Sequence, residues 1–225
     1  MRCFNFSSVF GKTLARLARE DGRVCGLTAA MMSGTGLIPF AEEFPERFFD
    51  VGIAEGCAVS MAAGMAKQGA IPVFAVYSTF LQRAYDMLLH DVALDNLHVV
   101  FGVDRAGLVG DDGATHQGVF DAAYLDSVPG MTVLAPSSFL ELEQMLEQAV
   151  LKMSGPVAVR YPRGGEGSYT EDSGNAPSVV LREGSDITLV GYGVEINEVL
   201  KAADLLKEQG IGGSGQTECD HAASA

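Results

Sequence analysis

The sequence predicts an α/β fold in which a mostly parallel sheet carries helices on both of its faces. Short apolar runs that read as buried strands alternate with longer segments of helical periodicity along most of the chain. Such alternation is typical of parallel sheets, because each helix carries the chain back to the start of the next strand. Hydrophobic residues make up 48% of the 225 residues, which is enough for a packed core.

The first helix is expected at residues 7–20, because Ser7 or Ser8 can cap it and apolar residues recur on one face. The helix at residues 56–68 is rich in alanine, and small side chains allow close packing. The other helices are predicted at residues 38–44, 81–93, 138–153 and 194–209. The strands are predicted at residues 23–28, 48–51, 71–76, 98–103, 131–134, 157–160 and 187–190.

The composition divides the chain into four parts. Residues 1–165 carry the alternating pattern, and residues 166–184 are rich in Gly, Ser, Asp and Glu, which is typical of a linker. A strand and a helix then indicate the start of a second domain over residues 185–210. Residues 211–225 lack periodicity, and we expect them to be disordered.

Charge and composition exclude several classes of protein. The formal net charge is −14, which argues against nucleic acid or an anionic membrane as a partner. The four cysteines form no Cys-x-x-Cys pair, and no apolar run is long enough to cross a bilayer. The amino terminus lacks the apolar core of a signal peptide. The expectation is therefore a cytoplasmic protein with reduced thiols.

The strongest functional signal is the segment at residues 104–118, which follows a buried strand. It holds four Gly and three Asp together with Arg105, Thr115, His116 and Gln117. Polar side chains just beyond a buried strand lie where open α/β sheets bind ligands. An ordinary polar surface loop is the simpler alternative, but such a loop does not need Arg105, Asp112 and His116 together.

Other polar residues also lie at the ends of predicted strands or at the start of a predicted helix. Glu55 opens an apolar helix, where it is either a helix-dipole partner or a buried acid able to share a proton. Tyr77 follows a buried strand, where packing at the strand end is the simpler interpretation. Arg105 and Arg163 each follow a strand, and two such arginines in an acidic chain suggest an anion site, since Arg binds phosphate in bidentate fashion.

Four blocks of sequence resemble the central, pyrimidine-binding domain of the 1-deoxy-D-xylulose-5-phosphate synthases, which are thiamine-diphosphate enzymes of the transketolase group. The resemblance covers roughly residues 4–210. The blocks are residues 49–55 (FDVGIAE), 77–86 (YSTFLQRAYD), 104–118 (DRAGLVGDDGATHQG) and 160–164 (RYPRG). The second block separates this family from ordinary transketolases.

The resemblance implies a cofactor site for thiamine diphosphate. Glu55 matches the acid that hydrogen-bonds the aminopyrimidine ring and favours the imino tautomer, whose nitrogen removes a proton from the thiazolium carbon. Phe80 matches the aromatic residue that packs on the pyrimidine. Arg83 matches a further position close to the cofactor pocket. In this family the protein supplies position and charge, and the cofactor supplies the difficult chemistry.

The resemblance also implies the substrates, pyruvate and glyceraldehyde 3-phosphate, which are condensed with loss of carbon dioxide. Tyr77, Arg105 and Arg163 match the groups around the phosphate of glyceraldehyde 3-phosphate. Asp112 and His116 match catalytic polar groups near the reacting substrate.

Two departures from the family pattern bear on activity. Gly56 and Cys57 stand where the family usually has Gln and His, so Cys57 is expected beside the cofactor site, which then has fewer polar groups. The family's magnesium and diphosphate ligands belong to an amino-terminal domain that this sequence does not contain, so no metal site is predicted here. We therefore expect the chain to be inactive alone and to need a diphosphate-binding domain or subunit.

The alternatives are a non-enzymatic remnant or binding module, and one subunit of a split transketolase-like enzyme. In either case the face that would meet the missing domain is expected to favour a homo-oligomer.

The segment after residue 212 suggests a shifted reading frame. Residues 213–223 can be encoded by codons that read, one nucleotide later, Glu-Val-Val-Lys-Leu-Asn-Ala-Ile-Thr-Pro. That peptide resembles the next apolar strand of the family and the proline turn that follows it. One inserted nucleotide would account for the change, and sequencing of the gene tests this hypothesis.

Overall fold

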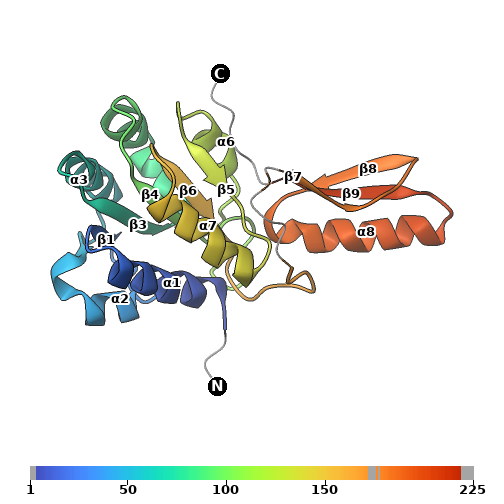
Figure 1. Cartoon of the computed structure of the whole chain (residues 1–225), viewed down its shortest axis with the longest axis horizontal. Helices are drawn as coiled ribbons and strands as arrows, with labels where there is room; N and C mark the ends of the chain where they lie inside the picture. Colours follow the sequence, from blue (N-terminus) through green and yellow to red (C-terminus); the bar gives the residue numbers. More distant parts are fainter. Residues whose placement is uncertain (1–3, 172–175, 177, 219–225) are drawn as a thin grey trace.

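A six-stranded parallel sheet forms the centre of the larger part of the molecule (Figure 1). The computed structural model describes residues 4–171, 176 and 178–218. Its strand order is β2-β1-β3-β4-β6-β5, and every neighbouring pair is parallel, which confirms the predicted fold class. The strands are β1 (Val24–Thr28), β2 (Phe48–Asp50), β3 (Ile71–Tyr77), β4 (Val100–Asp104), β5 (Thr132–Leu134) and β6 (Val157–Arg160).

One face of this sheet is covered by helices from the two ends of the domain, which lie side by side. Their apolar residues form one core cluster with strand residues such as Val73 and Val100. The helices of this face are α1 (Phe6–Glu20), α2 (Ile38–Glu43) and α7 (Phe139–Leu151). A short turn, η1 (Pro45–Arg47), follows α2.

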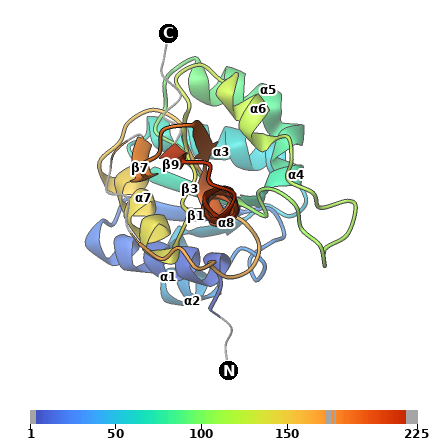
Figure 2. The same cartoon turned by 90° about the vertical axis from the view of Figure 1, so that its right-hand side faces the viewer.

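The opposite face carries the remaining helices of the domain (Figure 2). Phe74 and Phe101 point to this side, one residue along from Val73 and Val100, as the two-residue period of a strand requires. The helices here are α3 (Glu55–Lys67), the short segments between Ser78 and Ala93, and α6 (Asp121–Asp126), which the sequence analysis did not predict. Both faces are thus buried, which explains the nearly continuous apolar strands.

The amino-terminal cap of α1 differs from the prediction. Asn5, not Ser7 or Ser8, is the capping residue, and its Oδ1 accepts a hydrogen bond from the Ser8 backbone N–H at 2.8 Å. The Ser8 hydroxyl in turn accepts from the Asn5 backbone N–H at 3.1 Å, which closes a capping box. Ser7 is buried inside the first turn instead.

The predicted helix at residues 81–93 is not a single α-helix. The segment runs through α4 (Ser78–Leu81), η2 (Gln82–Ala84), α5 (Tyr85–Met87) and the π-helix η3 (Leu88–Ala93). Four apolar residues of this segment, Leu81, Ala84, Leu88 and Val92, are fully buried. Their spacings are three, four and four residues, so the winding tightens and then widens to keep all four in the core.

A second, three-stranded sheet follows, with the order β7-β9-β8 (Figure 1). Its strands are β7 (Ser178–Arg182), β8 (Ile187–Gly191) and β9 (Gly213–Glu218), and η4 (Gly193–Glu195) with α8 (Ile196–Glu208) connects β8 to β9. The expectation of a structureless linker through residue 184 is therefore wrong for β7. A short run such as Val179–Leu181 inside polar residues gives little periodicity, which is why the strand was missed.

The expectation of disorder beyond residue 210 is wrong for β9. This strand pairs antiparallel with β7 and parallel with β8. Backbone hydrogen bonds on both of its edges do not depend on large apolar side chains, whose scarcity led to the expectation. Residues 219–225 lie outside the described residues, and the shifted reading frame stays a prediction. Among the described residues, no helix has the length and apolar character needed to cross a membrane.

Candidate active site

The predicted site residues follow the carboxyl ends of neighbouring strands. Tyr77 ends β3 and pairs in register with Asp104, the last residue of β4. Arg160 ends β6 beside Val103. Because parallel strands end at one edge of a sheet, the segments that begin here, with Ser78, Arg105 and Tyr161, converge on that edge.

Glu55 is a buried carboxylate at the amino terminus of α3. It is 2% exposed, and its Oε2 lies 3.4 Å from Nη1 of Arg83, which reaches it from η2. The Arg83 guanidinium in turn lies 5.1 Å from the ring centroid of Phe80. The three residues that were predicted to line the cofactor pocket are therefore joined through Arg83.

Aromatic rings connect this acid to the rest of the site. Phe80 and Tyr77 lie stacked with their centroids 6.0 Å apart, and the ring of His116 lies 5.2 Å from Phe80 and 6.1 Å from Tyr77. His116 Nδ1 is 2.9 Å from the hydroxyl of Thr115, a contact that orients the imidazole. Burial raises the pKa of the Tyr77 phenol, so the phenol remains a neutral hydrogen-bonding group at neutral pH.

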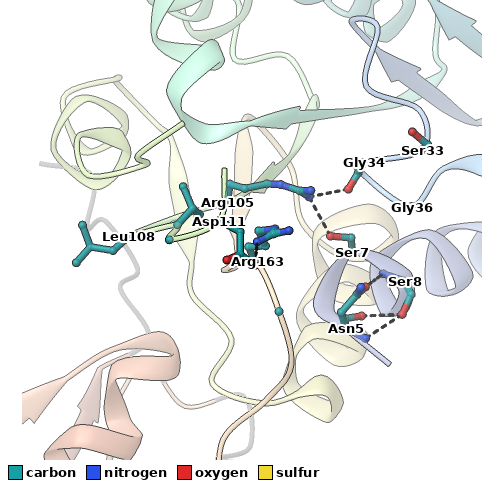
Figure 3. Close-up of a pocket in the computed structure, with 13 residues that line it drawn as sticks. Asn5, Ser7, Ser8, Ser33, Gly34, Gly36, Arg105, Leu108, Asp111 and Arg163 are labelled. Atoms are coloured by element: carbon teal, nitrogen blue, oxygen red, sulfur yellow. Dashed lines mark hydrogen bonds and ion pairs between the residues drawn. The ribbon is translucent and has the colours of Figure 1, made fainter. Parts of the chain in front are cut away.

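Arg105 is fixed by an unusual number of partners (Figure 3). Its Nη1 donates to Gly34 O at 2.6 Å, to Asp104 Oδ1 at 2.9 Å and to Ser7 Oγ at 3.3 Å. Its guanidinium lies 4.0 Å from the centroid of the Tyr77 ring. The backbone of Arg105 is left-handed, with φ of 60°, and this turn directs the side chain back across the strand ends.

Arg163 and Asp112 complete this half of the site. Asp112 Oδ2 lies 3.4 Å from Nε of Arg105 and 3.3 Å from Nε of Arg163, so one carboxylate bridges the two arginines. Arg163 also pairs with Asp111, at 2.9 Å from its Nη1. The contacts thus run without a break from Glu55 to Arg163 and include all eight predicted residues.

A cavity of about 670 Å³ opens beside the two arginines (Figure 3). Its wall includes Ser33 and Gly34 from the loop after β1, Ser8 from α1, and both arginines. Serine hydroxyls and two guanidinium groups suit an anionic ligand. Glu55, Phe80 and His116 are not part of this wall, so the cavity comprises only the arginine half of the predicted site.

Gln117, a residue with no predicted role, shapes the loop that carries Asp112 and His116. Its Oε1 accepts from the Val109 N–H at 2.9 Å, and its Nε2 donates to Val109 O at 2.9 Å and to Gly113 O at 2.8 Å. Gly107 and Gly118 close the loop through paired backbone hydrogen bonds. A lone Gln between loop residues carries no signal of this kind, because its partners are backbone atoms eight and four residues away.

Asp104 was also passed over, although it lies under the site. Its Oδ2 is buried with no hydrogen-bond partner among the described residues, and so is the hydroxyl of Tyr161. Burial raises the pKa of Asp104 to about 6, against the pull of Arg105 and Ser7 toward a lower value. Burial likewise raises the pKa of Tyr161 well above its ordinary range. The carboxyl of Asp104, which pairs with Arg105, therefore has a pKa close to neutral pH.

Gly56 and Cys57, the two residues that depart from the family pattern, lie at the start of α3. Cys57 is exposed two residues from Glu55. A Cβ at Gly56 would lie 3.0 Å from Cε of Met87, so the glycine leaves room for that side chain. No group of three or more His, Cys, Asp or Glu side chains able to hold a metal occurs within residues 4–171, 176 and 178–218.

Comparisons with known proteins agree with this architecture. The family model "Transketolase, pyrimidine binding domain" matches residues 4–165, and "Transketolase, C-terminal domain" matches residues 177–213. The 1-deoxy-D-xylulose-5-phosphate synthase of Desulforudis audaxviator is 54% identical over 212 residues, which are 92% of this chain and 33% of that protein. A second such synthase, from Geobacter sulfurreducens, is 52% identical with the same coverage.

Two solved structures extend the comparison. A protein described as "Split gene transketolase, inactive beta4 tetramer" is 30% identical with a TM-score of 0.83, and the match covers 95% of this chain and 70% of that one. Transketolase from Leishmania mexicana has the same TM-score at 18% identity, covering 96% of this chain and 34% of that one, and shows the fold alone. The chain spans about a third of the length of the curated synthases. It belongs to the transketolase family, as a pyrimidine-binding domain followed by a segment of the carboxyl-terminal domain.

Proposed function

We propose that this chain is the pyrimidine-binding portion of a thiamine-diphosphate-dependent 1-deoxy-D-xylulose-5-phosphate synthase. The observation that supports it best is the unbroken series of contacts that joins Glu55, through Arg83 and Phe80, to the paired arginines Arg105 and Arg163. A carboxylate for an aminopyrimidine and a cationic pocket for a phosphate are what the condensation of pyruvate with glyceraldehyde 3-phosphate requires.

The residues present fit the aminopyrimidine part of thiamine diphosphate. Glu55 is buried and stands at the amino terminus of a thirteen-residue helix, with Arg83 on one side of its carboxylate. Phe80 offers a partly buried ring nearby for stacking. Glu55 would hold a proton at the ring nitrogen, and Phe80 would orient the ring. When bound, the cofactor supplies a carbon nucleophile and an electron sink.

The remaining residues are assigned to the substrate. Arg105 and Arg163 would bind the phosphate of glyceraldehyde 3-phosphate, and Tyr77 would support Arg105 through its ring. His116 belongs to the same loop as Asp112 and lies against the rings of Tyr77 and Phe80, where it would bind a substrate oxygen or transfer a proton. Magnesium and the diphosphate would be held by a separate domain or subunit, which would complete the site.

Reconstitution tests this function. The chain is mixed with the amino-terminal domain of a related synthase, thiamine diphosphate, magnesium, glyceraldehyde 3-phosphate and carboxyl-labelled pyruvate, and labelled carbon dioxide is counted. We expect release that falls at least about 100-fold in Glu55→Gln. Glu46→Gln, which changes an exposed acid in η1, is the matched control. If the complete mixture releases no carbon dioxide while an intact synthase does, the enzymatic assignment fails.

A second candidate function is a binding module without activity of its own. Its support is that the cavity is lined by Arg105 and Arg163 but not by Glu55 or Phe80, so the pocket by itself resembles an anion-binding site. Calorimetry of the isolated chain then shows weak binding of thiamine diphosphate, or none, with or without magnesium. Tight magnesium-dependent binding would contradict it. A partner chain that restores carbon dioxide release would identify a subunit of a split enzyme instead.

Self-association is the third part of the proposal. Ile53, just before Glu55, and Phe120, just after the loop of His116, are large apolar residues exposed to solvent. Exposed apolar residues next to a site are typical of an interface. Light scattering at high protein concentration should give the mass of a dimer or a larger assembly, and a persistent monomer would contradict it.

A further inference from the structure

Asp111 and Asp112 are adjacent acids that contact the arginines of the pocket in different ways. Asp112 is 20% exposed in its side chain and bridges both arginines, as an integral part of the site. The Asp111 side chain is 87% exposed and belongs to the cavity wall, where its Oδ2 lies 2.9 Å from Nη1 of Arg163. Among the described residues, Arg163 is the ion-pair partner of Asp111.

The Asp111 contact occupies the part of Arg163 that a phosphate would need. Arg163 already turns its Nε toward Asp112, and its side chain is 37% exposed. A phosphate ester binds a guanidinium best through two parallel N–H donors, so Nη1 is the group that a ligand in the cavity would take. Asp111 and a phosphate oxygen would therefore compete for one donor.

The formal charges around the pocket also indicate that Asp111 weakens phosphate binding. Two arginines of the pocket, Arg105 and Arg163, stand against three carboxylates, those of Asp104, Asp111 and Asp112. The formal sum is two positive and three negative charges, which disfavours a dianion. Loss of the Asp111 charge, with no other change, brings this sum to zero.

The backbone allows Asp111 to leave. Gly110 and Gly113 flank the two acids, and Gly113 has φ of 79°. An exposed ion pair at a glycine-flanked turn is weak and is easily exchanged.

We propose that Asp111 sets the affinity of the arginine pocket for phosphate esters by acting as an internal competitor that must release Arg163 before the phosphate binds. This inference rests on the proposed function, because it takes the arginine pocket as the phosphate site. Asp111 is a specificity-determining residue here and not a catalytic one.

The test is a titration of the full chain with inorganic phosphate, followed by NMR at the Nε–Hε signals of the two arginines. Asp111→Asn should bind phosphate roughly two- to fivefold more tightly than the unmodified chain, the range that exposed ion pairs support. The gain should shrink as potassium chloride is raised, because screening weakens exposed charges. Asp126→Asn removes the same charge from the exposed end of α6, and its affinity should stay unchanged.

The outcomes separate the inference from the function. Equal or weaker binding by Asp111→Asn overturns the inference, and if Arg163→Leu still abolishes binding, the phosphate pocket stands. If neither the unmodified chain nor any variant binds phosphate, both the inference and the assignment of the pocket are wrong. An equal gain in Asp126→Asn would attribute the effect to net charge and would also overturn the inference.

Discussion

The two sheets of this molecule differ in how completely they are enclosed. In the six-stranded sheet, β1 and β4 are buried at every residue, with helices on both faces. In the three-stranded sheet, β7 and β8 have no buried residue, and Val180, Ile187 and Val190 are exposed although α8 packs nearby. The first sheet therefore carries most of the hydrophobic stabilisation, and the second leaves several apolar side chains exposed among the described residues.

The difference also explains where the site can lie. A sheet with both faces buried holds its strand ends in fixed positions, so Tyr77 and Asp104 arrive in register at one edge. Arg105 can then be held by partners that come from α1 and from the loop after β1. An open sheet offers no such frame, since its strand ends have fewer fixed neighbours. Four measurements would break or sharpen this contrast.

The largest effect is expected in the enclosed core. Phe101 is 0% exposed in the central strand β4, and Phe101→Ala should lower the free energy of unfolding by about 3–5 kcal/mol. Val190 is 53% exposed in β8, and Val190→Thr should change it by less than about 0.5 kcal/mol. Urea unfolding followed by circular dichroism measures both. Comparable destabilisation by the two changes would mean that the small sheet is as tightly packed as the large one.

The enclosed sheet has one weak point, the buried carboxyl of Asp104. Its pKa of about 6 in the folded chain exceeds the ordinary value of 3.8, so folding favours the protonated form. This favourable contribution is present below about pH 4 and is lost as the pH rises through 6. Stability relative to Asp104→Asn should then fall by on the order of 3 kcal/mol between about pH 4 and 7.

Unfolding midpoints of the two proteins across that pH range measure the Asp104 effect. Asp126→Asn serves as the control, since Asp126 is exposed on α6 and should not reproduce the trend. A constant difference between Asp104→Asn and the unmodified chain would show that the buried group does not titrate there.

A smaller effect is expected in the loop at the edge of the large sheet. Gln117→Ala removes the acceptor of the Val109 N–H and the donor to Gly113 O. Hydrogen exchange of the Val109 amide should accelerate about two- to tenfold, as expected for one lost hydrogen bond. Gln82→Ala changes an exposed glutamine in η2 and should leave this amide as it was. An unchanged exchange rate in Gln117→Ala would mean that the backbone hydrogen bonds between Gly107 and Gly118 are enough to hold the loop.

The smallest effect is expected in the open sheet. Arg182 of β7 forms an ion pair with Asp204 of α8, and both side chains are partly or largely exposed. Arg182→Gln should cost less than about 1 kcal/mol. Thermal unfolding in low and high salt measures this loss of stability. Lys201→Gln, which removes an exposed ion pair with Glu198 inside α8, is the control. A destabilisation several times larger would show that this pair holds the sheet to its helix.

Elements whose apolar residues follow a regular period could be predicted from the sequence. The buried strands and the helices with regular periodicity were predictable, because the period of the apolar residues fixes which side chains face the core. The grouping of Glu55, Arg83 and Phe80 was expected only from the resemblance to the family. The broken helix from Ser78 to Ala93 was not predictable, since its winding follows the packing of the whole face. Strand β9 was missed because its pairing is a property of its neighbours and not of its own side chains.

Within the site, the same division holds. An Arg after a strand is a recognisable signal, and Arg105 and Arg163 were found in that way. The roles of Gln117 and Asp104 depend on backbone atoms and on burial, which no spacing in the sequence records. The cavity was equally out of reach, because its wall combines α1, the loop after β1 and the loop after β4.

The left-handed backbone of Arg105 has a consequence for evolution and engineering. A residue with a side chain at φ of 60° costs on the order of 1 kcal/mol or more relative to glycine, so Arg105→Gly would relieve the backbone. The same exchange would delete the guanidinium that binds Gly34 O and faces the cavity. It would also leave the buried carboxylate of Asp104 without its ion-pair partner, which costs more than the strain that glycine relieves. Libraries built to stabilise the chain should keep residue 105 fixed, because the strained backbone there is offset by the contacts of the Arg105 guanidinium.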